Sequence, residues 1–118
     1  MRTMLKSKLH RARVTDANIQ YEGSITVDAE LLEAADILPY EMVHILDVDN
    51  GARLETYAIP GERGTGVVCV NGAAARLVQR GDTIIILTYA PVPEEKAREH
   101  RPILVYLDQR NKIIEAKA

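Results

Sequence analysis

Short apolar segments separated by turn residues run through this 118-residue chain, and this pattern constrains the fold more than any other feature. Strands are predicted at residues 24–27, 42–48, 53–59, 67–70, 83–90 and 103–107, and one or two more at residues 2–17, broken near residues 7–11. An Asp-Asn-Gly turn joins the segments at 42–48 and 53–59, which makes that hairpin the clearest local prediction. Many short strands predict a mainly β chain that closes into a barrel.

Short helices are predicted between some of these strands. Asp28 is a suitable N-cap for a helix over residues 29–35, and Asn71-Gly72 turns into a small helix at residues 73–78. A third, polar helix is expected within residues 91–100. Because no Pro-, Gly- or Ser-rich stretch is long enough to be a linker, we expect residues 1–118 to form a single domain.

Composition excludes several classes of protein. Fifteen Lys and Arg against 17 Asp and Glu give a net charge of −2, which argues against nucleic-acid binding as the main role. The longest apolar segment is far shorter than the roughly 20 residues of a membrane helix, and the N-terminus lacks the apolar region of a signal peptide. A single cysteine, Cys69, fits a reducing compartment and is predicted to fill the core. We expect a cytoplasmic protein with no nucleic-acid or membrane partner.

Simple binding motifs are weak in this chain. The three histidines lie far apart without metal-ligand spacing, so no metal site is predicted. Backbone N–H groups after Asn71 can bind an anion, but spacing alone favours an ordinary turn and helix cap. The GERGTG segment at residues 61–66 lacks the spacing of a dinucleotide-binding loop and is predicted to be a mobile loop.

The segment YEGSIT at residues 21–26 allows one specific reaction. Gly23 has no Cβ, so it can adopt backbone angles that open its carbonyl to attack by the Ser24 hydroxyl. An N-to-O acyl shift followed by β-elimination would cut the chain and leave dehydroalanine at position 24, and hydrolysis would convert this to a pyruvoyl group. Because Gly-Ser pairs are also common in turns, the dipeptide alone does not identify self-processing.

Four stretches, MLKSKLHRARVT, YEGSITVD, NGARLETYAI and VVCVNGAAARLVQRGDTIII, resemble the bacterial pyruvoyl-dependent aspartate 1-decarboxylases in order and separation. They cover residues 3 to about 90, and the resemblance is looser beyond Pro93. It implies a small double-psi β-barrel that cleaves itself between Gly23 and Ser24, into a β chain of residues 1–23 and an α chain of residues 24–118. The pyruvoyl cofactor made from Ser24 replaces pyridoxal phosphate, and no metal is implied.

The resemblance also implies a reaction and an assembly. Members of the family convert L-aspartate to β-alanine and CO₂ for pantothenate and coenzyme A synthesis. They form homotetramers with active sites between subunits, so cationic and pyruvoyl groups can come from different chains. Whether a maturation helper protein is a partner stays open.

Residue roles in cleavage and catalysis follow from the same resemblance. Ser24 becomes the pyruvoyl group that forms a Schiff base with the substrate amine, and Tyr57 donates a proton to the product. Thr56 assists cleavage by contacting the Gly23 carbonyl and later lines the substrate site. Without the resemblance, Tyr57 would be interpreted as a core aromatic. Because strand neighbours face opposite sides, Thr56 and Tyr57 need a bend to share a pocket.

The resemblance implies further contacts with a dianionic substrate. Lys8 and Arg53 match the positions that hold the two carboxylates of aspartate, as a mobile point charge and a planar fork. At Leu46 some relatives carry a large aromatic, so an aliphatic pocket wall is expected here. Backbone contacts to substrate are implied for Gly72, Ala73 and Ala74. Supporting positions are implied for His10, Tyr21 and Asn71, the last orienting its turn.

Two other functions fit the residues. A non-catalytic barrel that binds a small anion or a partner protein would use the Asn71 turn and the basic residues 6–13, and would need no cleavage. A related pyruvoyl enzyme acting on another amino acid would keep the chemistry, although the paired cations Lys8 and Arg53 favour a substrate with two carboxylates.

Overall fold

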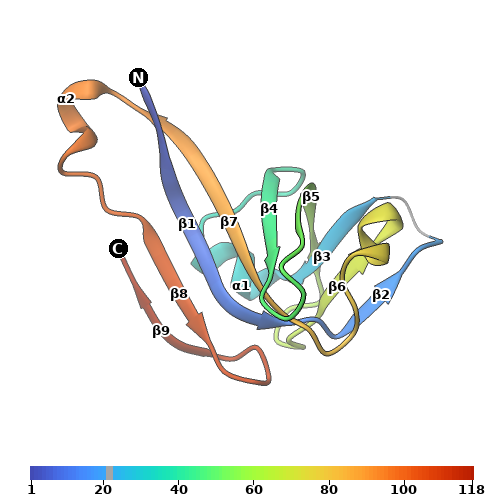
Figure 1. Ribbon diagram of the computed structural model, residues 1–118. Helices are drawn as coiled ribbons and strands as arrows, with labels where there is room; N and C mark the ends of the chain where they lie inside the picture. The colour runs from blue at the N-terminus through green and yellow to red at the C-terminus, as the bar shows by residue number, and fades with distance from the viewer. Residues whose placement is uncertain (21–22) are drawn as a thin grey trace.

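The computed structural model describes residues 1–20 and 23–118 and is built mainly of strands (Figure 1). Within these residues the strands are β1 Arg2–Arg13, β2 Asp16–Asn18, β3 Ser24–Asp28, β4 Met42–Asp47, β5 Arg53–Gly61, β6 Val68–Asn71, β7 Thr83–Val92, β8 Ile103–Leu107 and β9 Ile113–Lys117. The helices are α1 Ala29–Ala34, the 3₁₀ helix η1 Gly72–Arg76 and α2 Glu94–Ala97. The predicted mainly β fold with short helices is confirmed. None of the helices described is long and apolar enough to cross a membrane.

All these strands belong to one mixed sheet in the order β2-β6-β3-β5-β4-β7-β1-β8-β9. Strands β3 to β6 form the curled body of the sheet. Strands β1, β7, β8 and β9 extend from this body as an arm that carries both termini (Figure 1). A curled sheet of this kind is consistent with a small β-barrel. β3 lies between β5, which is parallel to it, and β6, which is antiparallel.

The predicted break near residues 7–11 is wrong, because β1 runs without interruption from Arg2 to Arg13. Its pairing with β7 instead shifts twice, between Leu5 and Ser7 and between Leu9 and Ala12. Arg11 has a φ of 67°, which places it in the left-handed region. Irregularities of this kind bend a strand without ending it. β1 therefore bends but stays one continuous strand.

The core follows the two-residue alternation of the strands. Ile25 and Val27 of β3 are fully buried, as are their neighbours Ala58 on β5 and Val70 on β6. Further fully buried side chains are Leu9, Val14, Ile45, Val68, Ile84, Ile86 and Val105. Since alternate residues point to opposite faces, Ser24 and Thr26 of β3 lie on the face away from this core.

Asp28 fixes the start of α1 and the loop after β5. It is buried, and its carboxylate accepts hydrogen bonds from the backbone N–H of Glu30, Gly64 and Gly66, at 2.8 to 3.0 Å. Burial alone would raise the pKa of Asp28, but these three donors outweigh it and lower the pKa. The GERGTG loop is thereby attached to the first turn of α1.

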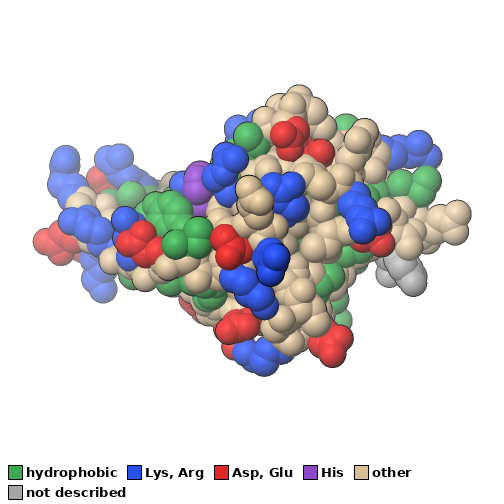
Figure 2. Space-filling view, turned by 90° about the horizontal axis from the view of Figure 1, so that it is seen from below, with side chains coloured by type: hydrophobic (Ala, Val, Ile, Leu, Met, Phe, Trp, Pro, Cys, Tyr) green, Lys and Arg blue, Asp and Glu red, His purple; other side chains and the backbone are tan. Residues whose placement is uncertain are grey.

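Across the face seen in Figure 2, Lys and Arg are interspersed with Asp and Glu.

Candidate active site

A cavity of about 560 Å³ lies on the outer face of β3, β5 and β6. Its lining residues are Ser24, Thr26, Tyr40, Tyr57, Ile59, Cys69 and Asn71. Strand register explains why most of them meet, because Ser24 pairs with Asn71, and Thr26 pairs with both Cys69 and Ile59. Paired residues on adjacent strands point to the same face of a sheet. Three strands thus present one polar surface around Ser24, while their alternate residues fill the core.

Asn71 organises the polar groups of this cavity. Its Nδ2 donates to Ser24 Oγ at 3.2 Å and to Thr26 Oγ1 at 3.1 Å, and its Oδ1 accepts from Cys69 Sγ at 3.3 Å. Ser24 and Asn71 are only 7% and 6% exposed. Asn71 is the N-cap residue of η1, as predicted, but its side chain makes no capping hydrogen bond to that helix. Its amide turns to β3 instead and fixes the position of the Ser24 hydroxyl oxygen.

Gly23, the residue before Ser24, is exposed at the entrance to β3. A Cβ added there would meet no described atom within 4 Å. The described surroundings therefore do not require glycine for space. The predicted supporting residue Tyr21 lies outside the described residues.

Tyr57 is half-buried and faces the cavity rather than the core. Ile25 of β3 pairs with Ala58 of the parallel strand β5. Ser24 and Tyr57 are the residues just before these two, so they are neighbours across the sheet. The ring of Tyr40 lies 6.2 Å from that of Tyr57, measured between centroids. Two phenol groups therefore stand on the side of the cavity opposite Asn71.

Thr56 does not line this cavity. It pairs with Val43, a core residue that is 1% exposed, whereas Tyr57 pairs with the exposed Met42. The pairing of β4 with β5 continues without a register shift from residue 53 to residue 57. The bend that would let Thr56 and Tyr57 share a pocket is therefore absent, and the two side chains point to opposite faces.

Lys8 and Arg53 also lie outside the cavity of their own chain. Arg53 lines a separate cavity of about 240 Å³ with His44, Leu46, Leu54 and Glu55. It shares a face of β5 with Tyr57, but four residues of strand separate their Cα atoms by roughly 13 Å. Lys8 does not line the Ser24 cavity either, and it lies on β1 where that strand pairs with β7 and β8. Within one chain, the two predicted carboxylate-binding cations do not meet the predicted catalytic serine.

The remaining predicted residues lie in two places. His10 is on the arm, where its ring packs edge-on against Tyr106 with 5.4 Å between centroids. Burial, followed by the positive charges of Lys8 and Arg11, lowers the pKa of His10. Three further predicted residues, Gly72, Ala73 and Ala74, follow Asn71 directly and form the start of η1. They do not line the cavity.

Sequence reasoning missed four residues of the cavity. Thr26, Ile59 and Cys69 follow from strand alternation only once the pairing of β3 with β5 and β6 is known. Cys69 was predicted to fill the core, which is wrong, because it is half-exposed on the cavity face. Tyr40 is 75% exposed, has a φ of 69° and lies in the loop between α1 and β4, where no periodic pattern applies.

Comparisons with known proteins agree over nearly the whole chain. The aspartate 1-decarboxylases of Pelotomaculum thermopropionicum and Moorella thermoacetica are both 60% identical to it, over 115 and 116 residues. These matches cover 98% of this chain and 87% and 91% of those proteins. The aspartate 1-decarboxylase of a Geobacillus species is 59% identical over 112 residues, covering 95% of this chain and 88% of that protein. Because the family model described as aspartate decarboxylase also matches residues 1–114, this chain belongs to the aspartate decarboxylase family.

Proposed function

We propose that this protein is a pyruvoyl-dependent aspartate 1-decarboxylase that converts L-aspartate to β-alanine and CO₂ and so supplies pantothenate and coenzyme A synthesis. The observation that carries the proposal is the position of Ser24. It begins β3 on the cavity face, its hydroxyl oxygen is held by Asn71, and Tyr57 stands on the adjacent strand. Family membership and this geometry favour the same reaction centre.

Cleavage between Gly23 and Ser24 is the first step of the proposal. Ser24 Oγ attacks the Gly23 carbonyl, the C–O bond forms as the C–N bond breaks, and the hydroxyl proton moves to the departing nitrogen. β-Elimination then breaks the Cβ–O bond of residue 24 and leaves Gly23 with a free carboxylate. Hydrolysis of the dehydroalanine releases ammonia. Asn71 supports the attack because its amide donates to Oγ and leaves the hydroxyl hydrogen free to depart.

Thr56 fits this first step better than the later ones. Ile25 pairs with Ala58 in the parallel register of β3 and β5. Two residues earlier on each strand, the same register places Thr56 opposite Gly23. A threonine hydroxyl there can donate to the Gly23 carbonyl and stabilise the negative charge that develops on its oxygen. We therefore assign Thr56 to cleavage and not to the cavity wall.

The strand pairing supports a single domain that survives cleavage. The β chain of residues 1–23 would contain β1 and β2, and the α chain of residues 24–118 would contain β3 to β9. β1 pairs with β7 and β8, and β2 pairs with β6, so both strands of the short fragment are paired with the long one. The two fragments would stay associated after the peptide bond is cut.

After cleavage, a pyruvoyl group at position 24 supplies the electron sink that decarboxylation requires. The residues of the chain bind and orient the substrate and move one proton. Tyr57 faces the cavity beside position 24, so its phenol is the donor of the proton that replaces CO₂ on the substrate carbon. We assign backbone contacts with the substrate to Gly72, Ala73 and Ala74, which follow Asn71 in η1.

A neighbouring subunit would complete the site. The described side chains that line the cavity include no Lys or Arg, yet a substrate with two carboxylates needs positive partners. Lys8 and Arg53 lie on other parts of their own chain. We therefore assign them to the cavity of an adjacent subunit in a homotetramer, with His10 and Tyr21 as supporting residues.

Denaturing electrophoresis and an aspartate decarboxylation assay on the same preparations test the proposal. The native chain should give two fragments and release β-alanine. Ser24→Ala should give one folded chain without activity, because the attacking hydroxyl is gone. A non-catalytic barrel that binds an anion or a partner protein would instead stay intact and inactive as the native sequence, and that result would overturn the proposal.

A further inference from the structure

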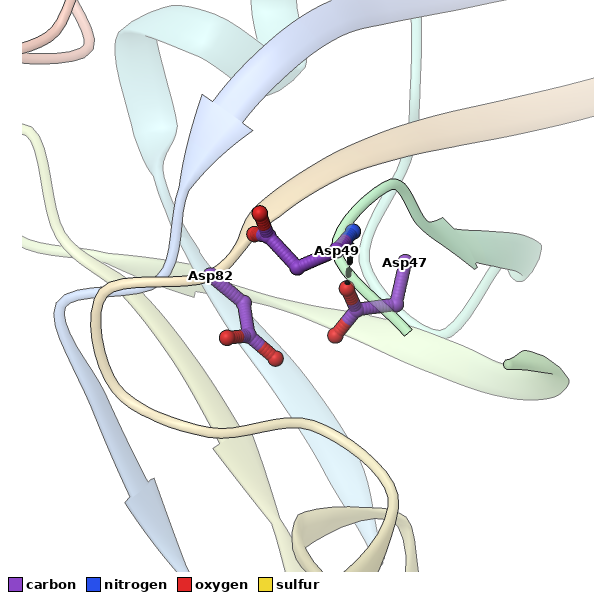
Figure 3. A group of neighbouring side chains, drawn as sticks. All are labelled: Asp47, Asp49 and Asp82. Carbon is purple, nitrogen blue, oxygen red and sulfur yellow. Dashed lines mark hydrogen bonds between the residues drawn. The ribbon is translucent and has the colours of Figure 1, made fainter. Parts of the chain in front are cut away.

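Three aspartates that the proposed reaction does not use converge at one end of the sheet (Figure 3). Asp47 is the last residue of β4, Asp49 lies in the β4–β5 turn, and Asp82 immediately precedes β7. Pairing of β4 with β7, which ends at Asp47 and Ile84, brings the two turns together. One carboxylate oxygen from each aspartate lies within 4.8 Å of the other two.

Asp47 is the member of this cluster that most needs a partner. Its side chain is only 2% exposed, and its Oδ1 accepts from the backbone N–H of Asp49 at 2.8 Å and of Asn50 at 3.3 Å. Its Oδ2 is buried and has no hydrogen-bond partner among the described residues. Figure 3 shows the Asp82 carboxylate facing that of Asp47. A buried carboxylate oxygen without a donor is costly and indicates a missing positive group.

The other two carboxylates each keep one oxygen available. Asp49 Oδ2 accepts from the backbone N–H of Thr83 at 2.7 Å, and Asp82 Oδ2 accepts from that of Gln79 at 3.0 Å. The ion pairs within the described residues include none of the three aspartates. Burial, followed by the adjacent Asp82 carboxyl, raises the pKa of Asp47 to about 6. Among the described residues, the three carboxylates therefore have no Lys, Arg or His as an ion-pair partner.

We propose that Asp47, Asp49 and Asp82 form a binding site for a hard divalent cation, with Ca²⁺ as the best fit. All three ligands are carboxylate oxygens, which favour Ca²⁺ or Mg²⁺ over transition metals. The three oxygens lie within 4.8 Å of one another, which is compatible with one shared ion. Ca²⁺ tolerates irregular carboxylate geometry, whereas Mg²⁺ demands a near-ideal octahedron and keeps most of its water. Water fills the remaining positions.

A bound cation would join two segments that are far apart in sequence. It would hold the β4–β5 turn against the turn before β7, where Thr83 N–H already donates to Asp49. Because three protein ligands are few, we expect a Kd on the order of 0.1–1 mM, as in weak extracellular calcium modules. The site would stabilise the fold and has no part in the proposed decarboxylation.

Thermal unfolding of the full chain, freed of metal with EDTA at about pH 8, tests the proposal. CaCl₂ at about ten times the expected Kd should raise the Tm by roughly 4–8 °C above a NaCl control of equal ionic strength. Asp47→Asn should abolish the rise, because it removes a ligand charge while keeping an oxygen for the turn. Asp36→Asn, at an exposed aspartate outside the cluster, should show the full rise.

Calorimetric titration with CaCl₂ keeps the test valid if Asp47→Asn unfolds. Asp82→Asn should then weaken Ca²⁺ binding by at least about tenfold relative to the native chain. No Ca²⁺-dependent rise in the native chain would overturn the proposal and leave Asp47 and Asp82 sharing a proton. An equal rise in the native chain and Asp47→Asn would overturn it as well, since the ion would then bind elsewhere.

Discussion

Replacing Asn71 with alanine tests whether the cavity positions Ser24 for the proposed self-cleavage. In the structure, Asn71 Nδ2 donates one hydrogen bond to Ser24 Oγ at 3.2 Å and another to Thr26 Oγ1 at 3.1 Å. Asn71→Ala removes both bonds and leaves the Ser24 hydroxyl free to rotate. Since Ser24 is only 7% exposed, water replaces the lost amide poorly.

The size of the effect follows from the bond that is lost. A neutral hydrogen bond in a protein contributes about 0.5–1.5 kcal/mol net, and leaving a buried partner unsatisfied costs about 1–3 kcal/mol. If about 1–2 kcal/mol of this positioning energy is lost from the attack on the Gly23 carbonyl, cleavage slows by roughly 5–30-fold. The free energy of unfolding should fall by about 1–3 kcal/mol, because two bonds are lost.

Intact mass spectrometry over time measures the fraction of chain cleaved after purification. Thr26→Val is the matched control, because it removes only the bond that does not involve Ser24 and keeps the size and β-branching of the side chain. We expect Thr26→Val to cleave within about twofold of the native rate. If Asn71→Ala cleaves at the native rate while remaining folded, the Asn71 amide does not position Ser24 and this reasoning is wrong.

Three further predictions concern turnover, assembly and stability. Tyr57→Phe should be cleaved normally, but its kcat for aspartate should fall about 10²–10⁴-fold, and an unchanged kcat would remove Tyr57 as proton donor. Mixing Ser24→Ala with Arg53→Ala chains under exchange conditions should restore activity if the two residues of a site come from different subunits; persistent inactivity despite confirmed exchange would contradict this. Asp28→Asn should lower the free energy of unfolding by about 1.5–3 kcal/mol at neutral pH in urea titrations. Because folding lowers the pKa of Asp28, this difference should shrink as the pH falls through that pKa, and a difference that persists in acid would refute the charge argument.

Local sequence patterns predict those helices and strands that have one buried, apolar face and one exposed, polar face. The hairpin of β4 and β5 was predictable because its strands alternate around an Asp-Asn-Gly turn, and α1 because Asp28 precedes it. β9 was missed because every one of its residues is exposed, so its sequence carries no contrast between faces. β1 was divided in the prediction because two register shifts interrupt its alternation.

The candidate site depends on long-range pairing, which local patterns do not contain. Ser24 meets Asn71 only because β3 pairs with β6, which lies more than 40 residues later in the chain. The resemblance to the family predicted Ser24, Tyr57 and Asn71, and all three line one cavity. It did not predict Thr26, Cys69 or Tyr40. The cluster of Asp47 with Asp82 was not predicted either, because the two residues meet only through the pairing of β4 with β7.

The intact mass of the fragment that begins at residue 24 tests the central claim most directly. A pyruvoyl terminus makes this fragment lighter, by the mass of ammonia, than the same fragment beginning with serine. We expect that lighter mass in protein that decarboxylates aspartate, together with a fragment of residues 1–23. Fully active protein that is uncleaved, or whose second fragment begins with an unmodified serine, would contradict the account.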